Sequence, residues 1–115
     1  MWGDGSAKRE FTYVNDVANF VVNKIGETKS MPTVMNLGAG EDYSIREYYE
    51  KIANIMGFGG EIISLPNKPI GMKRKLMDSS LAAAHGWNPK TDLDSGLLET
   101  IESYRKCREE LNGNE

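Results

Sequence analysis

Apolar residues recur every three or four positions in four stretches of this chain, which is the spacing of an amphipathic helix. The most regular stretch follows Ser44, where Ser44 and Glu47 form an S-x-x-E capping box and Gly57 ends the pattern. The spacing and its flanking cap residues predict four helices, from Asn15 or Asp16 to Gly26, from Ser44 to Gly57, from Ser79 or Ser80 to Gly86, and from Thr91 or Asp92 to about Leu111.

Short runs of β-prone residues lie before and between these helices. They predict strands over residues 11–14, 33–37 and 61–65 and a shorter one over residues 74–77. Four short strands and three to four helices in a chain of this size indicate a small α+β lobe.

Length and composition limit the chain to one domain. A chain of 115 residues forms a modest core but not two lobes, and we expect a domain over residues 1–110 followed by a polar tail over residues 111–115. The net charge of −3 argues against broad binding to nucleic acid or to a membrane surface. Cys107 is the single cysteine, so no internal disulfide forms, and we expect a cytoplasmic protein.

The sequence lacks the patterns that would indicate catalysis within this chain. The turn Gly38-Ala39-Gly40 resembles part of a G-x-G-x-x-G motif, but Tyr43 stands where the third glycine belongs. No tyrosine is followed by a lysine four residues later, and His85 is the only histidine. One cysteine and one histidine do not make a zinc site of nitrogen and sulfur ligands. We therefore assign no catalytic and no metal-ligating residue.

Two cationic segments are candidates for binding an anionic ligand. Arg9 lies between a glycine turn and a strand-to-helix unit, and a guanidinium offers a rigid fork of donors to a phosphate. Residues 68–75 form the densest basic cluster, which is either a solvent-exposed loop or a second contact that converges with Arg9 on one diphosphate. Trp2 is either a core residue or a wall for a base or sugar ring.

Several sequence elements occur in the order seen in the extended short-chain dehydrogenases/reductases. They are Trp2-Gly3-Asp4-Gly5, Arg9-Glu10-Phe11, Tyr13-Val14-Asn15-Asp16-Val17-Ala18, Asn36-Leu37-Gly38-Ala39-Gly40, Ser44-Ile45-Arg46-Glu47, Lys68-Pro69 with Gly71 and Arg74-Lys75-Leu76, and Gly86-Trp87-Asn88-Pro89. From Trp2 to about Tyr104 the chain resembles this superfamily of NAD-dependent epimerases and dehydratases. Within it, the resemblance is greatest to the carboxy-terminal lobe of the GDP-L-fucose synthases and similar GDP-sugar epimerase/reductases.

This resemblance implies a substrate lobe without a Rossmann half. In such enzymes the Rossmann lobe binds NADP and carries the catalytic serine, tyrosine and lysine, so we expect this chain to bind no cofactor and to be inert alone. The positions of Trp2, Arg9 and Lys75 face the nucleotide-sugar in the related enzymes, with the two cations near its diphosphate. We expect the same of these three residues. The related loop usually has an acidic residue where Ile70 stands, which leaves the nucleotide and the sugar open.

The resemblance also implies partners. We expect a GDP-sugar as ligand, a Rossmann lobe in the same or a separate chain, and a possible homodimer of the parent enzyme, because binding-type residues at the very start suggest the later part of a longer protein. Three alternatives remain open: the lobe of a UDP- or dTDP-sugar epimerase/dehydratase, a non-catalytic stand-alone binding or assembly module, and a nucleic-acid module using residues 73–75.

Overall fold

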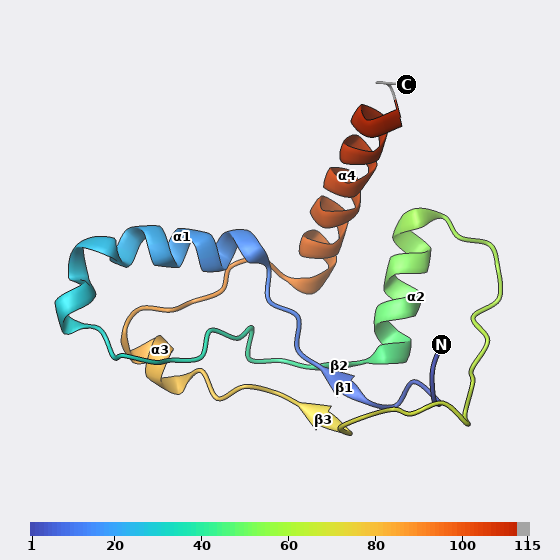
Figure 1. Ribbon diagram of the computed structural model, residues 1–115, viewed down its shortest axis with the longest axis horizontal. Coiled ribbons are helices and arrows are strands. Elements are labelled where there is room, and N and C mark those ends of the chain that lie inside the picture. Colours follow the sequence, from blue (N-terminus) through green and yellow to red (C-terminus); the bar gives the residue numbers. More distant parts are fainter. Residues whose placement is uncertain (113–115) are drawn as a thin grey trace.

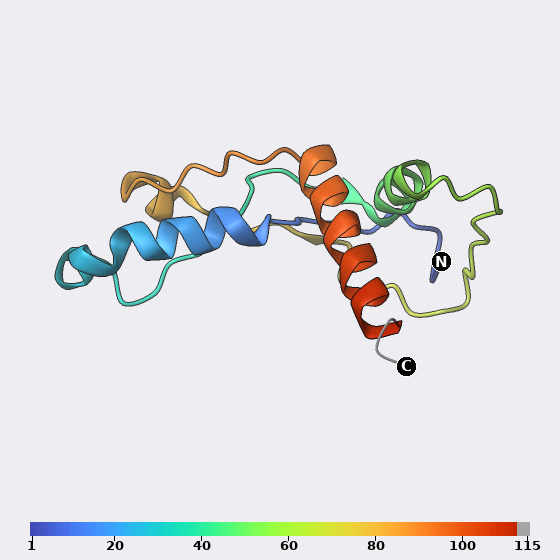
Figure 2. The same ribbon diagram turned by 90° about the horizontal axis from the view of Figure 1, so that it is seen from above.

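The computed structural model describes residues 1–112 and shows a flat, open arrangement (Figures 1 and 2). The molecule measures 50 × 41 × 22 Å, with a radius of gyration of 17.4 Å. A compact domain of this length would have a radius of gyration of about 13 Å. Helix α1 and the short α3 lie at one end, α2 and α4 lie at the other, and a small sheet lies between them (Figure 1).

The sheet contains three strands of two residues each, in the order β2-β1-β3. The strands are β1 (Lys8–Arg9), β2 (Tyr43–Ser44) and β3 (Arg74–Lys75). β1 pairs antiparallel with β2 and parallel with β3, so residues far apart in the sequence meet at the centre of the molecule. The prediction of a short strand within residues 74–77 is confirmed by β3.

Helix α2 (Ile45–Met56) forms as its sequence predicts. The Ser44 hydroxyl accepts the Glu47 amide at 3.1 Å, and the Glu47 carboxylate accepts the Ser44 amide at 2.7 Å. Gly57 ends the helix with φ = 66°, a left-handed conformation that glycine adopts without steric cost. The capping box joins α2 directly to β2, and this places the helix beside the sheet.

The other three predicted helices also form, with α1 at Val14–Lys24, α3 at Ser80–Ala84 and α4 at Leu93–Asn112, and a 3₁₀ turn η1 at Ile25–Ser30 follows α1. The predicted start of α1 is wrong, because Asp16 lies inside its first turn and does not cap it. The Asp16 carboxylate instead accepts the amides of Lys90 and Thr91 at 3.0 and 2.9 Å, and so joins α1 to the segment that precedes α4.

Three predicted strands, over residues 11–14, 33–37 and 61–65, do not form. A strand requires a hydrogen-bonded neighbour, and in the described part of the chain these runs find almost none. The exceptions are Ile63, whose carbonyl accepts the Met1 amine at 2.7 Å, and Leu65, which makes isolated bridges to Trp2 and Gly3. Val14 instead begins α1, and the other residues of these runs have no continuous hydrogen-bonded neighbour within residues 1–112.

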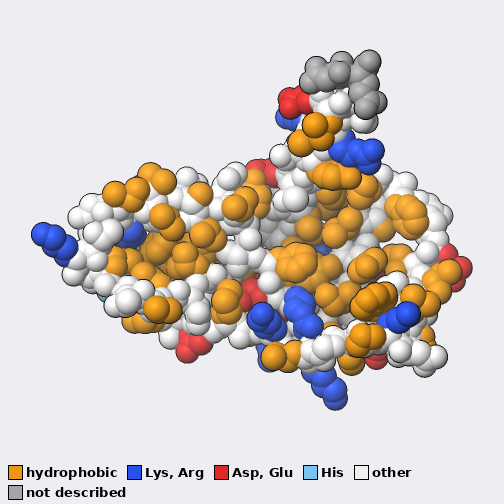
Figure 3. All heavy atoms as spheres, in the orientation of Figure 1, with side chains coloured by type: hydrophobic (Ala, Val, Ile, Leu, Met, Phe, Trp, Pro, Cys, Tyr) orange, Lys and Arg blue, Asp and Glu red, His pale blue; other side chains and the backbone are white. Residues whose placement is uncertain are grey.

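Few side chains are buried. The buried apolar residues of the described chain are Ala7, Tyr48, Ala82, Trp87 and Ile101. Many residues expected on the inner faces of helices are exposed, among them Val21, Ile25, Leu98, Tyr104 and Leu111. Apolar side chains gather over both ends of the face drawn in Figure 3. No described segment covers these helix faces, so the amphipathic pattern of the sequence exceeds the core that this chain builds.

The last two residues of α4 are Leu111 and Asn112, which are also the first residues of the predicted polar tail. Residues 113–115 of that predicted tail lie outside the described residues. None of the helices within residues 1–112 combines the length and the apolar composition that crossing a bilayer requires.

Candidate functional site

The centre of the sheet brings the two predicted cationic residues together. Arg9 and Lys75 are opposite each other in the parallel pair β1–β3. Opposite residues of neighbouring strands point to the same face of a sheet, with about 5 Å between the strands. The chain therefore places two positive side chains, 66 residues apart in sequence, on one face of the same sheet.

Contacts on both sides fix the position of Arg9. Its Nη1 donates to the carbonyl oxygens of Lys8 at 2.6 Å and of Met72 at 2.8 Å. The Tyr48 hydroxyl donates to the Arg9 carbonyl at 2.8 Å, and burial raises the pKa of Tyr48 to about 12. Within residues 1–112 the guanidinium uses only Nη1, which leaves the donors on Nε and Nη2 for a ligand.

Trp2 and Arg9 line one cavity of about 450 Å³. Its other walls include Tyr49, Leu65 and Ile70, so the cavity combines apolar side chains with the cationic side chain of Arg9. Ile70 packs against the backbone of Gly3, because a side chain at Gly3 would place its Cβ 1.9 Å from Ile70 Cγ2. The structure brings Trp2 and Arg9 together, whereas Lys75 is not among the residues that line this cavity.

The basic cluster at residues 68–75 is divided into parts with different roles. The Arg74 guanidinium pairs with the Asp42 carboxylate, whose side chain is only 4% exposed, and this hydrogen bond lowers the pKa of Asp42. Lys8 Nζ lies 3.9 Å from the same carboxylate. Lys75 has no ionic partner within the described chain. Arg74 is therefore already occupied by a carboxylate, and Lys75 remains available to an anion.

Two residues at this site were missed by the sequence analysis. Tyr48 belongs to the apolar stripe of α2, and nothing in that pattern shows that its hydroxyl reaches Arg9. Glu10 lies next to Arg9, and its carboxylate accepts the amides of Gly40 and Met77. A glutamate directly after a strand arginine is the only sequence signal of this role.

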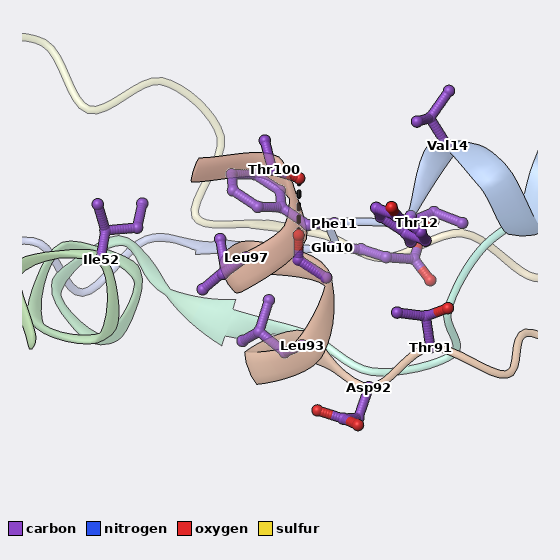
Figure 4. A pocket seen from close by; sticks show the side chains of 12 residues that line it. Glu10, Phe11, Thr12, Val14, Ile52, Thr91, Asp92, Leu93, Leu97 and Thr100 are labelled. Atoms are coloured by element: carbon purple, nitrogen blue, oxygen red, sulfur yellow. Dashed lines mark hydrogen bonds between the residues drawn. The ribbon is translucent and has the colours of Figure 1, made fainter. Parts of the chain in front are cut away.

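A larger cavity of about 540 Å³ lies between residues 10–14, α2 and the start of α4 (Figure 4). Phe11, Ile52, Leu93 and Leu97 surround it, and the charged residues that line it, Glu10 and Asp92, are acidic. Because it offers no cation, this cavity is less suited to a phosphorylated ligand than the cavity beside Arg9. No group of three metal-ligating side chains occurs within residues 1–112.

Comparison with known proteins finds that this chain is similar to part of several nucleotide-sugar enzymes. Residues 1–38 match the NAD dependent epimerase/dehydratase family. The chain is 44% identical over 104 residues to a GDP-L-colitose synthase of Yersinia pseudotuberculosis, and the aligned region covers 90% of this chain and 34% of that protein. It is 37% identical over 115 residues to a GDP-L-fucose synthase of Azorhizobium caulinodans, and the aligned region covers all of this chain and 35% of that protein.

Solved structures agree with these sequence matches. A UDP-glucose 4-epimerase of Thermotoga maritima, solved with UDP-glucose, superposes with a TM-score of 0.78 at 26% identity, over 93% of this chain and 34% of that one. A GDP-mannoheptose C4 reductase of Campylobacter jejuni, solved with NADP bound, gives a TM-score of 0.71 at 34% identity, over 91% of this chain and 34% of that one. The chain spans about one third of the length of the curated relatives it matches. Sequence and fold together show that this chain is similar, over 90–100% of its length, to about one third of each of these nucleotide-sugar enzymes, and that its residues 1–38 match the NAD dependent epimerase/dehydratase family.

Proposed function

We propose that this chain is the nucleotide-sugar-binding part of an NAD(P)-dependent epimerase/reductase that acts on a GDP-linked keto sugar. The observation that carries the proposal is the identity of 37–44% to GDP-sugar synthases, which extends over 90–100% of the chain. The geometry supports it, because Arg9 and Lys75 lie opposite each other and the cavity lined by Trp2 adjoins Arg9.

The role of the chain in the reaction is placement. Arg9 and Lys75 bind the diphosphate, and each charge-assisted hydrogen bond contributes roughly 1.5–3 kcal/mol. Trp2 and the apolar wall of the cavity at Ile70 contact a ring of the ligand. Holding the ligand at both points orients the keto sugar toward groups that lie on another lobe, which lowers the entropic part of the barrier.

That other lobe binds NADP and carries the catalytic serine, tyrosine and lysine, in the same or a separate chain. The exposed apolar faces of α1 and α4 support such a partner, because water-exposed apolar surface of this extent is typical of an interface. No residue of this chain is assigned to the cofactor or to the chemical step. The chain alone therefore binds nucleotide-sugar weakly and catalyses nothing.

The nucleotide is tested by titrating the chain with GDP, UDP and dTDP while recording its NMR spectrum. We expect GDP to shift the signals of Trp2, Arg9 and Lys75 at lower concentration than UDP or dTDP. Arg9→Ala is the test variant, which should weaken GDP binding. Arg74→Ala is its matched control, since Arg74 is already paired with Asp42. A preference for UDP or dTDP, or equal loss of binding in both variants, contradicts the proposal.

The division of labour is tested by assaying the chain with NADPH and a GDP-4-keto-6-deoxy sugar. We expect no reduction by the chain alone and restored reduction when a dinucleotide-binding lobe is supplied. Turnover by the isolated chain would refute this part of the proposal.

A further inference from the structure

Glu10 connects three segments of the chain at the edge of the candidate site. One carboxylate oxygen accepts the Gly40 amide at 2.7 Å, and the other accepts the Met77 amide at 3.0 Å. These partners lie 30 and 67 residues away in sequence. Glu10 directly follows Arg9, and Met77 comes two residues after Lys75. The carboxylate thus joins the ends of the two strands that carry the cations.

The β1–β3 pairing depends on few bonds. The parallel ladder consists of two residue pairs, Lys8 with Arg74 and Arg9 with Lys75. On its amino-terminal side the Lys8 amide donates to the Lys73 carbonyl at 2.7 Å. On its carboxy-terminal side the bond from Met77 to Glu10 secures the exit of β3. The Arg9 side chain adds a bond to the Met72 carbonyl before β3 begins, and Arg74 is paired with Asp42. A ladder of this length has little cooperative strength of its own, so a side-chain bond at the end of β3 contributes to where Lys75 lies.

The space around the carboxylate is built to hold it in place. A Cβ at Gly38 would lie 2.5 and 2.8 Å from the two Glu10 oxygens, so only glycine leaves room for the carboxylate. The Trp87 indole donates to the Gly38 carbonyl at 2.7 Å and anchors this glycine in the buried core. Ser79 Oγ lies 2.8 Å from the same Cβ position, buried and with no hydrogen-bond partner within residues 1–112. The carboxylate therefore has one well-defined position.

We propose that Glu10 is a positioning residue, which fixes Arg9 and Lys75 opposite each other so that both reach one diphosphate. The inference rests on the proposed function, since it names the residue that organises the binding site proposed there. Glu10 itself does not contact the ligand, because its two oxygens face the backbone amides of Gly40 and Met77.

The test is Glu10→Gln, with Glu47→Gln as the matched control. Both substitutions replace a carboxylate that accepts a backbone amide, but Glu47 caps α2 and does not touch β3. A glutamine at position 10 keeps one acceptor and turns its NH₂ group toward the other amide. We expect the NMR cross-strand contacts between the backbones of Arg9 and Lys75 to be lost in Glu10→Gln, while those between Lys8 and Ser44 remain.

Binding is measured on the same samples with GDP as the probe. We expect Glu10→Gln to weaken GDP binding by about tenfold, the order of one lost charge-assisted hydrogen bond, and Glu47→Gln to leave it unchanged. We also expect Lys75→Ala to have less effect in the Glu10→Gln background than in the parent. Gly38→Ala is a second variant, which should displace the carboxylate while leaving Glu10 intact.

The outcomes separate this inference from the proposed function. Retained contacts between Arg9 and Lys75 in Glu10→Gln and Gly38→Ala would overturn the positioning role, and so would lost contacts with unchanged GDP binding. Global unfolding of Glu10→Gln, with Glu47→Gln still folded, would show a general stabilising role and also overturn it. A parent chain that binds no GDP would refute the proposed function, and the claim about Glu10 would then be decided by the cross-strand contacts alone.

Discussion

Replacing Gly3 by alanine tests how tightly the apolar wall of the cavity is packed. Gly3 has φ = +68°, and a Cβ there would lie 1.9 Å from Ile70 Cγ2. An L-residue in this left-handed conformation costs about 1–2 kcal/mol. Forcing a methyl group into occupied space adds roughly 1–3 kcal/mol. The two costs together predict that Gly3→Ala lowers the free energy of unfolding by about 2–5 kcal/mol.

Gly57 provides a control with nearly the same backbone conformation. Its φ is +66°, and a Cβ there meets no atom within 4 Å. Gly57→Ala should therefore show the conformational cost alone, about 1–2 kcal/mol. In urea unfolding followed by circular dichroism, a difference of about 2 kcal/mol between the variants separates their midpoints by roughly 1 M.

The double variant Gly3→Ala/Ile70→Ala isolates the steric clash between the new methyl group and the Ile70 side chain. Removing the Ile70 side chain beyond Cβ opens the space that the new methyl group needs. We expect the double variant to be more stable than the sum of the two single changes predicts, by about 1–3 kcal/mol. If Gly3→Ala costs no more than Gly57→Ala, or if the two changes are additive, the packing of Ile70 on Gly3 is not what fixes this wall.

Three further predictions follow from the sheet and its neighbours. Lys75→Ala should weaken GDP binding about tenfold, the effect of one lost charge-assisted hydrogen bond, and Arg74→Ala should weaken it far less; calorimetric titration of both variants checks this. The pKa of Asp42 lies below its ordinary value of 3.8 because Arg74 bonds to it. The ionised Asp42 carboxylate therefore contributes its full stabilisation above pH 3.8, and this contribution is lost as the pH falls through the lower pKa of the folded state. Asp42→Asn should remove this part of the acid-induced loss of stability, which urea unfolding at a series of pH values measures. Tyr48→Phe should lower the free energy of unfolding by about 1 kcal/mol, since the hydrogen bond to the Arg9 carbonyl is lost; an unchanged urea midpoint would contradict this.

Local signals in the sequence predict the helices well. The capping box at Ser44 and Glu47 and the glycine at position 57 act within one turn of the chain, so α2 forms where they indicate. Strand prediction fails over residues 33–37, because a strand needs a neighbour and no described segment provides one. The prediction of burial fails in the same way at Val21 and Ile25, because no segment within residues 1–112 covers their side chains.

The candidate site was predictable only in part. The residue types of Arg9 and Lys75 indicate anion binding, but their register arises from a pairing across 66 residues that no local pattern encodes. The role of Glu10 also depends on where two distant backbone amides come to lie. The sequence likewise does not show that Arg74, unlike its neighbour Lys75, is paired with Asp42.

The two tryptophans of this chain occupy contrasting environments. Trp2 is 61% exposed and lines the cavity beside Arg9, whereas Trp87 is 5% exposed and donates its indole proton to Gly38. Collisional quenchers such as acrylamide therefore reach one indole and not the other in the native chain. Under the proposed function, shielding of the Trp2 emission reports a ligand in the cavity beside Arg9. A red shift of the Trp87 emission reports loss of tertiary structure. The chain thus contains two intrinsic optical probes that distinguish ligand capture from denaturation without any attached label.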